Sequence, residues 1–165
     1  MGEGIGFKCS RCQKEYGAFW GIGFMFPIEY EKEMRAAKAG KYGAEWKNLT
    51  KGEKYVAIDA SSHVYVCGKC GYWNVEPNRS LYVPKNPEAL RIKYKMECGK
   101  KLESRKSVMP CDLAEDYRIL KRRMHKCGKC GSIMRRIRNV KRIQLPCPYC
   151  GGAPEESGEN RIIWD

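Results

Sequence analysis

The sequence lacks any hydrophobic run long enough to cross a membrane. Its longest uncharged stretch, Tyr16–Ile28, has 13 residues and is interrupted by glycines and a proline, whereas a transmembrane helix needs about 20 apolar residues. The first six residues also lack the basic and apolar segments of a secretory signal peptide. We therefore expect an intracellular, cytoplasmic protein, a setting in which paired cysteines are metal ligands more often than disulfides.

Histidine is scarce as well, which leaves few candidates for a general base. The chain has only His63 and His125. Residues 146–150, Pro-Cys-Pro-Tyr-Cys, match half of the zinc nucleobase-deaminase signature, but neither histidine is followed two residues later by the glutamate that this chemistry needs. The glycines near the start lack the lysine of a phosphate-binding loop. We therefore expect a protein that is not an enzyme.

Cysteine, in contrast, is abundant, because eight of the ten cysteines form four CxxC pairs. Two intervening residues allow both thiolates of a tight turn to bind one ion, and two such turns complete a tetrahedral zinc shell. The last two pairs are 16 residues apart and the first two are 54 apart, so we expect neighbouring pairs to share a site, although spacing alone does not exclude interleaved pairing. The predicted ligands of two zinc ions are Cys9, Cys12, Cys67, Cys70, Cys127, Cys130, Cys147 and Cys150.

The residues around these pairs resemble a known structural class. Cys127–Gly131 with Cys147–Gly152 resembles a zinc ribbon, the rubredoxin-like arrangement in which two cysteine turns hold a small antiparallel sheet. Phe7–Tyr16 and Tyr65–Trp73 resemble the halves of a second ribbon. The resemblance implies the fold type and a bound metal but no particular function, because ribbons serve in transcription, translation, nucleic-acid enzymes and protein docking. Iron is the alternative metal and implies a one-iron electron carrier.

The predicted fold is a small, metal-stabilised α+β protein with two zinc ribbons of short antiparallel strands. The first ribbon is interrupted by a helical insertion, and a strand and a helix join it to the second. The predicted domains are residues 1–84 for the N-terminal ribbon, with the insertion at about 29–49, residues 85–123 for the connection, and residues 124–165 for the C-terminal ribbon with its basic surface.

Local patterns define the remaining elements. Residues 90–98 alternate apolar and charged side chains, which predicts a strand. Asp112 is expected to cap an amphipathic helix whose apolar stripe runs from Leu113 to Met124. In the second ribbon, residues 132–137 and 143–145 are expected to pair, with residues 161–164 as a closing strand.

Two cysteines fall outside the CxxC pairs. We expect Cys98 and Cys111 to be buried as small apolar side chains without a ligand role. A cysteine pair or a spare metal ligand is the alternative.

The absence of acidic residues from 117 to 154 is the strongest functional signal, because the same segment holds eleven basic ones. The net charge of +13 falls to about +9 when two four-thiolate zinc sites are counted. Arginines outnumber lysines here seven to four, which suits bidentate contacts with phosphate. A solvated face, compensation of the zinc thiolates, an acidic protein or a membrane surface are alternatives. The predicted contacts with a DNA or RNA backbone are Lys121, Arg122, Arg123, Arg135, Arg136, Arg138, Lys141 and Arg142.

Four aromatic residues near the first cysteine pair suggest a second possible function. We expect Phe19, Trp20, Phe24 and Phe26 to lie in the core, because so small a domain needs its aromatic side chains inside. If they form an exposed face instead, the chain is an adaptor or accessory subunit that docks onto a protein partner.

Overall fold

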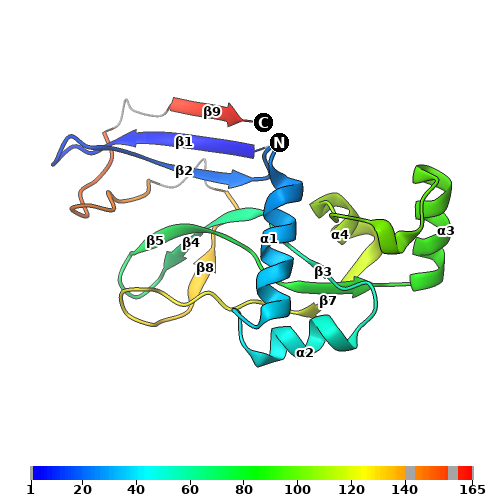
Figure 1. The fold of residues 1–165 in the computed structure, drawn as a ribbon. Helices are drawn as coiled ribbons and strands as arrows, with labels where there is room; N and C mark the ends of the chain where they lie inside the picture. The colour runs from blue at the N-terminus through cyan, green and yellow to red at the C-terminus, as the bar shows by residue number, and fades with distance from the viewer. Residues whose placement is uncertain (1, 140–143, 156–159, 165) are drawn as a thin grey trace. The chain divides into compact units, whose positions relative to one another are not determined.

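The protein divides into two compact units, each assembled from separate stretches of the chain. The structure, a computed structural model, describes residues 2–139, 144–155 and 160–164 (Figure 1). Unit 1 comprises Met1–Phe24, Ser61–Pro77 and Met124–Asp165, and unit 2 comprises Met25–Ala60 and Asn78–Arg123. This division differs from the predicted domains 1–84, 85–123 and 124–165, because residues 25–60 and 78–123 fold together.

Unit 1 is built on an antiparallel sheet. Its strands follow the order β5-β4-β2-β1-β9, and β8 also pairs with β4. Strands β1 and β2 form a hairpin in register from Gly2↔Gly21 to Lys8↔Glu15. The strands are β1 (Gly2–Lys8), β2 (Glu15–Gly21), β4 (Ser62–Cys67), β5 (Trp73–Pro77), β8 (Met134–Arg136) and β9 (Asn160–Trp164).

The core of unit 1 surrounds the cysteines. Ile5 and Phe7, two residues apart on β1, are buried together with Tyr16 and Trp73, and Gly6 between them is half-buried, as expected for side chains that share one face of a strand. On β1, a Cβ atom at Gly4 would lie 2.5 Å from the ring of Phe19. Gly4 therefore allows an aromatic ring to pack directly against the backbone of its partner strand.

The four aromatic residues near the first cysteine pair do not share one environment. Phe26 is buried and Trp20 packs partly against the core, as predicted. Phe24 is 81% exposed and Phe19 is 44% exposed, so the prediction of a core position is wrong for these two. Phe26 also belongs to unit 2, whereas the other three belong to unit 1.

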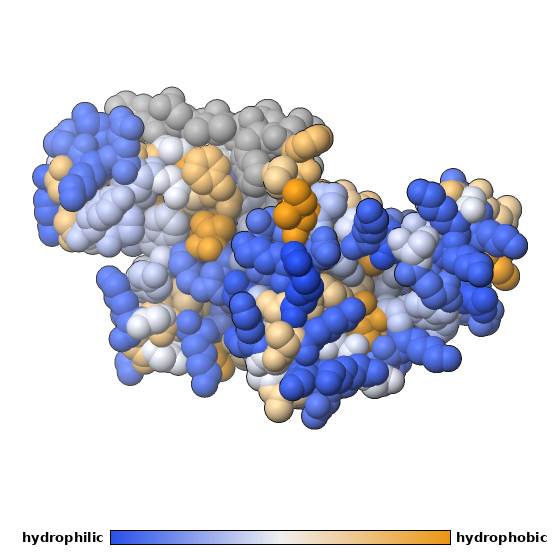
Figure 2. Space-filling view, viewed as in Figure 1, coloured by the Kyte–Doolittle hydropathy of each residue, from blue (hydrophilic) through white to orange (hydrophobic). Residues whose placement is uncertain are grey.

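Unit 2 packs short helices around a small antiparallel sheet of order β3-β6-β7. The helical insertion predicted at about 29–49 is present as two helices, α1 and α2, which belong to unit 2 rather than to a ribbon. In Figure 2 the side of α1 and α2 that faces the viewer is mostly hydrophilic. The elements are α1 (Phe26–Ala39), α2 (Ala44–Gly52), β3 (Ala57–Ile58), β6 (Leu81–Pro84), α3 (Pro87–Cys98), a 3₁₀ helix (Leu102–Ser104), α4 (Pro110–Asp116) and β7 (Tyr117–Lys121).

The strand predicted for residues 90–98 is wrong, because this segment is helix α3. The Oδ1 atom of Asn86 accepts a hydrogen bond from the N–H of Ala89 at 3.1 Å, Pro87 stands in the first turn, and Gly99 ends the helix with φ +65°. These start and stop signals outweigh the alternating pattern. Of the alternating apolar residues, only Leu90 is buried.

The helix predicted from Asp112 to Met124 is also shorter than expected. Helix α4 ends at Asp116, and Tyr117 begins β7, which pairs with β6 through Pro84↔Tyr117. Asp112 lies inside α4 and its carboxylate accepts from the N–H of Met109 at 3.2 Å. Pairing with a neighbouring strand therefore overrides the helical periodicity. Across the described parts of the chain, no helix combines the length and apolar character needed to cross a membrane.

Candidate metal centres

The eight paired cysteines form two groups, and each group is arranged to hold a metal ion. Within each group the four Sγ atoms lie within 4.8 Å of one another. The Sγ–Sγ distances are 3.5 and 3.7 Å in one group and 3.4 and 3.6 Å in the other. Tetrahedral zinc with Zn–S bonds of about 2.3 Å requires sulfurs about 3.8 Å apart, so both groups fit. The outer site is Cys9, Cys12, Cys147 and Cys150, and the inner site is Cys67, Cys70, Cys127 and Cys130.

The pairing is nested, which corrects the expectation that neighbouring CxxC pairs share a site. Strand β4 pairs with β8, with Cys67 opposite Met134, and this pairing places the second turn beside the third. A bridge between Cys9 and Pro154 places the first turn beside the fourth. The N–H of Glu155 strengthens that contact by donating to the carbonyl of Lys8 at 2.8 Å.

The strands expected within the second ribbon are therefore rearranged. Strand β8, inside the predicted 132–137, pairs with β4 rather than with residues 143–145. Residue 143 lies outside the described residues, and Leu145 is fully buried in the core around the outer site. Strand β9, predicted as 161–164, pairs with β1.

All four cysteine turns have the same backbone geometry. In each, the N–H four residues after the first cysteine donates to that cysteine's carbonyl, at 2.8 to 3.0 Å. The residue that follows the second cysteine has a left-handed φ between 58° and 72°. Glycine adopts this conformation without strain, and three of the turns have glycine there. The four residues are Gln13, Gly71, Gly131 and Gly151.

The thiols of each site are electrostatically coupled. The N–H of Cys12 lowers the pKa of Cys9 to about 6, and the hydroxyl of Ser132 lowers the pKa of Cys130 to about 6. The N–H of Lys14 lowers the pKa of Cys12, but burial and the neighbouring cysteines raise it more, to about 11. Without a cation, four thiolates in one site would repel one another, so some of the thiols keep their protons. Binding of a divalent metal ion would release these protons.

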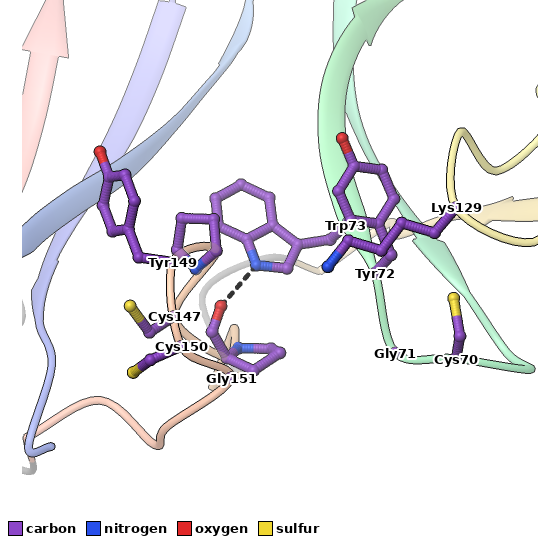
Figure 3. Close-up of a pocket in the computed structure, with 11 residues that line it drawn as sticks. Cys70, Gly71, Tyr72, Trp73, Lys129, Cys147, Tyr149, Cys150 and Gly151 are labelled. Atoms are coloured by element: carbon purple, nitrogen blue, oxygen red, sulfur yellow. Dashed lines mark hydrogen bonds between the residues drawn. The ribbon is translucent and has the colours of Figure 1, made fainter. Parts of the chain in front are cut away.

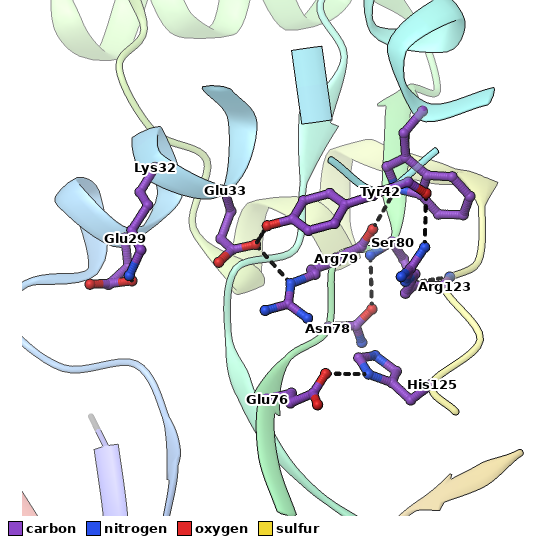
Figure 4. Close-up of polar contacts among 11 residues, drawn as sticks. Glu29, Lys32, Glu33, Tyr42, Glu76, Asn78, Arg79, Ser80, Arg123 and His125 are labelled. Carbon is purple, nitrogen blue, oxygen red and sulfur yellow. Dashed lines mark hydrogen bonds and ion pairs between the residues drawn. The ribbon is translucent and has the colours of Figure 1, made fainter. Parts of the chain in front are cut away.

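Buried polar contacts surround the sites. The Tyr16 hydroxyl donates to the carbonyl of Leu145 at 2.7 Å, beside the fourth turn. Next to the inner site, His125 Nδ1 lies 3.1 Å from a carboxylate oxygen of Glu76 (Figure 4) and its ring stacks on Tyr65 at 3.9 Å. His125 is buried and is not part of either cysteine group. The described residues offer no ligand to either metal site beyond the four sulfurs.

The predicted nucleic-acid contacts are divided between the two units. Arg135, Arg136 and Arg138 are exposed in unit 1, together with Lys126 and Lys129. Lys121, Arg122 and Arg123 belong to unit 2, whereas Lys141 and Arg142 lie outside the described residues.

Two of the predicted contacts in unit 2 are held by neighbouring side chains. Lys121 lies 2.6 Å from the carboxylate of Glu45. Arg123 donates to the carbonyl of Tyr42 at 3.0 Å and covers the rings of Tyr42 and Trp46 (Figure 4). The structure thus gives Arg123 a packing role within unit 2.

The two remaining cysteines differ from their prediction. Cys98 and Cys111 are both exposed, at the end of α3 and the start of α4. The burial predicted for them is therefore wrong. Cys98 is exposed because α3 is a helix in which only Leu90 is buried. Neither cysteine belongs to a metal group among the described residues.

A groove between the two sites was not foreseen from the sequence. It has a volume of about 490 Å³ and is lined by residues of the second, third and fourth cysteine turns. Figure 3 shows Tyr149 and Tyr72 on opposite sides of the Trp73 indole, with Lys129 beside Tyr72. Tyrosines within or just after two CxxC pairs were the available signal, but the nested pairing that joins them is not visible in the sequence.

The chain was compared with protein-family models, with curated proteins and with solved structures. No family model, no curated protein and no solved structure matches it.

Proposed function

We propose that this is a non-catalytic, two-zinc protein that binds a nucleic-acid backbone through unit 1. The observation that carries the proposal is a group of five exposed cations at and next to the inner site. No acidic residue occurs from 117 to 154. Within the described residues, no ion pair neutralises any member of this group, which we call the basic strip: Lys126, Lys129, Arg135, Arg136 and Arg138.

The donor set supports zinc as the metal. Four thiolates at tetrahedral spacing form a closed shell that leaves no position for a catalytic water. When bound, zinc would supply folding free energy to a unit whose core is small. Iron can bind the same four sulfurs. Absorption spectra distinguish the two metals, because a ferric four-thiolate site is red whereas the zinc protein is colourless.

Net charge alone would favour unit 2, which has 20 basic and 12 acidic residues against 12 and 7 in unit 1. Several cations of unit 2, however, lie in ion pairs with carboxylates of that unit, and its acidic residues occur throughout its sequence. Arg79 lies 2.9 Å from the buried carboxylate of Glu33, and Lys93 lies 2.9 Å from both Glu115 and Asp116. Unpaired guanidinium groups on a strand are better placed to contact phosphate bidentately.

The dependence of binding on salt tests the proposal. If the five cations each neutralise one phosphate, log K should fall with log salt at a slope of about −3.5 on a single strand and about −4.5 on a duplex. Replacing Arg135, Arg136 and Arg138 with glutamine should weaken binding and make the slope shallower by two to three units, roughly one per contact.

A matched variant separates the strip from total charge. Changing Arg35, Lys38 and Lys95 to glutamine removes three exposed charges from unit 2 and should leave the slope unchanged. Equal losses in both triple variants, or no binding at low salt, would overturn the proposal and favour a protein partner. Zinc content should stay at two equivalents in each variant, since none of these residues is a ligand.

The three arginines should contribute unequally. Adjacent residues on a strand point to opposite faces, and Arg136 lies opposite Tyr65 whereas Arg135 lies opposite Val66. We expect the single Arg135→Gln and Arg136→Gln variants to differ in their effect on binding, whereas Arg138 lies beyond the end of β8 and is not placed on either face by this alternation.

A further inference from the structure

The groove between the two metal sites has the composition of an aromatic binding surface. Its eleven lining residues include Tyr72, Trp73 and Tyr149, two prolines and Lys129, and none is acidic. Its volume of about 490 Å³ lies within the range of small-molecule sites, about 300–1,000 Å³. The groove can therefore hold a flat group of the size of a nucleobase.

The rings differ in what they can offer a ligand. Trp73 is 8% exposed, and its indole N–H is already used by the carbonyl of Pro146 at 2.7 Å (Figure 3), so it forms the floor. Tyr149 is 63% exposed. The hydrogen bond fixes the floor in place, and Tyr149 forms an accessible wall.

Lysine side chains cover the outer rings. Lys129 Nζ lies 5.1 Å from the ring centre of Tyr72, and Lys14 Nζ lies 4.8 Å from that of Tyr149. Such contacts at exposed sites contribute only about 0.5–1 kcal/mol, so a stacking ligand can displace them. The released ammonium groups would then be free to contact phosphates on either side of a stacked base.

The charges also indicate which part of a nucleotide fits the groove. Cys70, Cys147 and Cys150 line it, and each metal-bound four-thiolate site carries a formal charge of about −2. A phosphate inside the groove would be repelled by this charge, whereas a neutral base would not. Lys129 belongs both to the groove and to the basic strip, so a strand whose phosphates follow the strip can place a base here.

We propose that this groove receives an unpaired base, and hence that the nucleic acid bound by unit 1 is single-stranded. The inference deepens the proposed function and rests on it. Stacking on an aromatic side chain contributes enough to weaken binding about 5- to 150-fold when the ring is removed. It requires the base to be out of a duplex, because paired bases are stacked on one another.

The experiment compares three labelled probes of twelve nucleotides, namely oligouridylate, oligothymidylate and an abasic strand, with a duplex as a fourth. The wild-type protein should bind both base-containing strands about 10-fold or more tightly than the abasic strand. Tyr149→Leu removes the ring but keeps an apolar side chain, and it should abolish that preference. Tyr149→Phe keeps the ring and should retain it. Oligouridylate and oligothymidylate represent single-stranded RNA and DNA, and both should show the preference over the abasic strand.

The outcomes separate this inference from the proposed function. Loss of the three strip arginines should weaken binding of the abasic and base-containing strands alike, whereas Tyr149→Leu should affect only the latter. Equal affinity of the wild-type protein for the abasic strand, or tighter binding of the duplex, would overturn the inference while leaving backbone binding intact. Failure to bind any probe would overturn both. Binding of a proline-rich peptide that Tyr149→Leu abolishes would instead assign the groove to a protein ligand.

Discussion

The indole N–H of Trp73 donates to the carbonyl of Pro146 at 2.7 Å, and this bond ties the hairpin of the inner site to the fourth cysteine turn of the outer site. Trp73 begins β5, three residues after Cys70, and Pro146 directly precedes Cys147. The buried side chain of Trp73 thus connects the two metal sites of unit 1.

Trp73→Phe should therefore loosen both sites together. The substitution removes a hydrogen bond and leaves a partial cavity, which should destabilise unit 1 by about 2–3 kcal/mol. Zinc transfer to a chromogenic chelator should become faster for both equivalents.

Trp46→Phe is the matched control for this change. Trp46 donates a similar bond at 2.9 Å to the carbonyl of Arg79 within unit 2. The control should leave zinc transfer unchanged. If Trp73→Phe accelerated the release of only one equivalent, the two sites would not be linked in this way.

The glycine that follows the second cysteine of a turn should resist substitution. Gly71 has φ +70° and open space around its position for a Cβ atom, so Gly71→Ala tests backbone conformation without a clash. The left-handed conformation costs a residue with a side chain about 1–2 kcal/mol. Chemical denaturation should show that loss, whereas Gly68→Ala in the same turn, with equal space and no left-handed φ, should change stability by less than about 0.5 kcal/mol.

The sequence was informative where a signal is local. Each CxxC turn could be recognised because its ligands and its hydrogen bonds lie within six residues, and helices α1 and α2 were found from their composition. The nested pairing could not be recognised, because it depends on β4 meeting β8 and on β1 meeting residue 154. The 16-residue spacing between the last two pairs is also compatible with a ribbon in which these two pairs share one metal site. Spacing alone therefore favoured the wrong pairing of the cysteine turns.

Helix α3 illustrates a second limit. Its alternating apolar residues predicted a buried strand face, yet Ile92 and Met96 are 60% and 81% exposed. The alternating spacing of these residues did not correspond to burial. The residues that predict the helix are those at its ends, Asn86, Pro87 and Gly99. The wrong prediction of burial for Cys98 has the same cause, because a strand would have placed this side chain on the buried face.

His63 should make unit 1 less stable in mild acid. Burial, followed by the positive charges of Arg136 and His125, lowers the pKa of His63 from 6.5 to about 4. Between these values the unfolded chain binds a proton that the folded chain does not, so stability is complete above pH 6.5 and falls as the pH decreases toward 4. Because the side chain is partly exposed, the loss should reach only about 2 kcal/mol.

An NMR titration with saturating zinc measures this pKa directly. Arg136→Gln should raise the pKa of His63 toward its ordinary value, because it removes a nearby positive charge. His63→Gln should flatten the difference in unfolding free energy between pH 7 and pH 5. A wild-type pKa near 6.5 would contradict the burial of this side chain.

Metal analysis of paired substitutions tests the nested arrangement most directly. Cys9→Ser with Cys147→Ser changes two ligands of one site and should leave one zinc per chain, whereas Cys9→Ser with Cys67→Ser disables both sites and should leave none. Pairing of neighbouring turns predicts the opposite result for both variants, and interleaved pairing predicts that both lose all zinc. The double variant Cys98→Ser with Cys111→Ser should retain two equivalents, because both cysteines are exposed and belong to neither group. Loss of zinc from this last variant would show that one of them is a ligand.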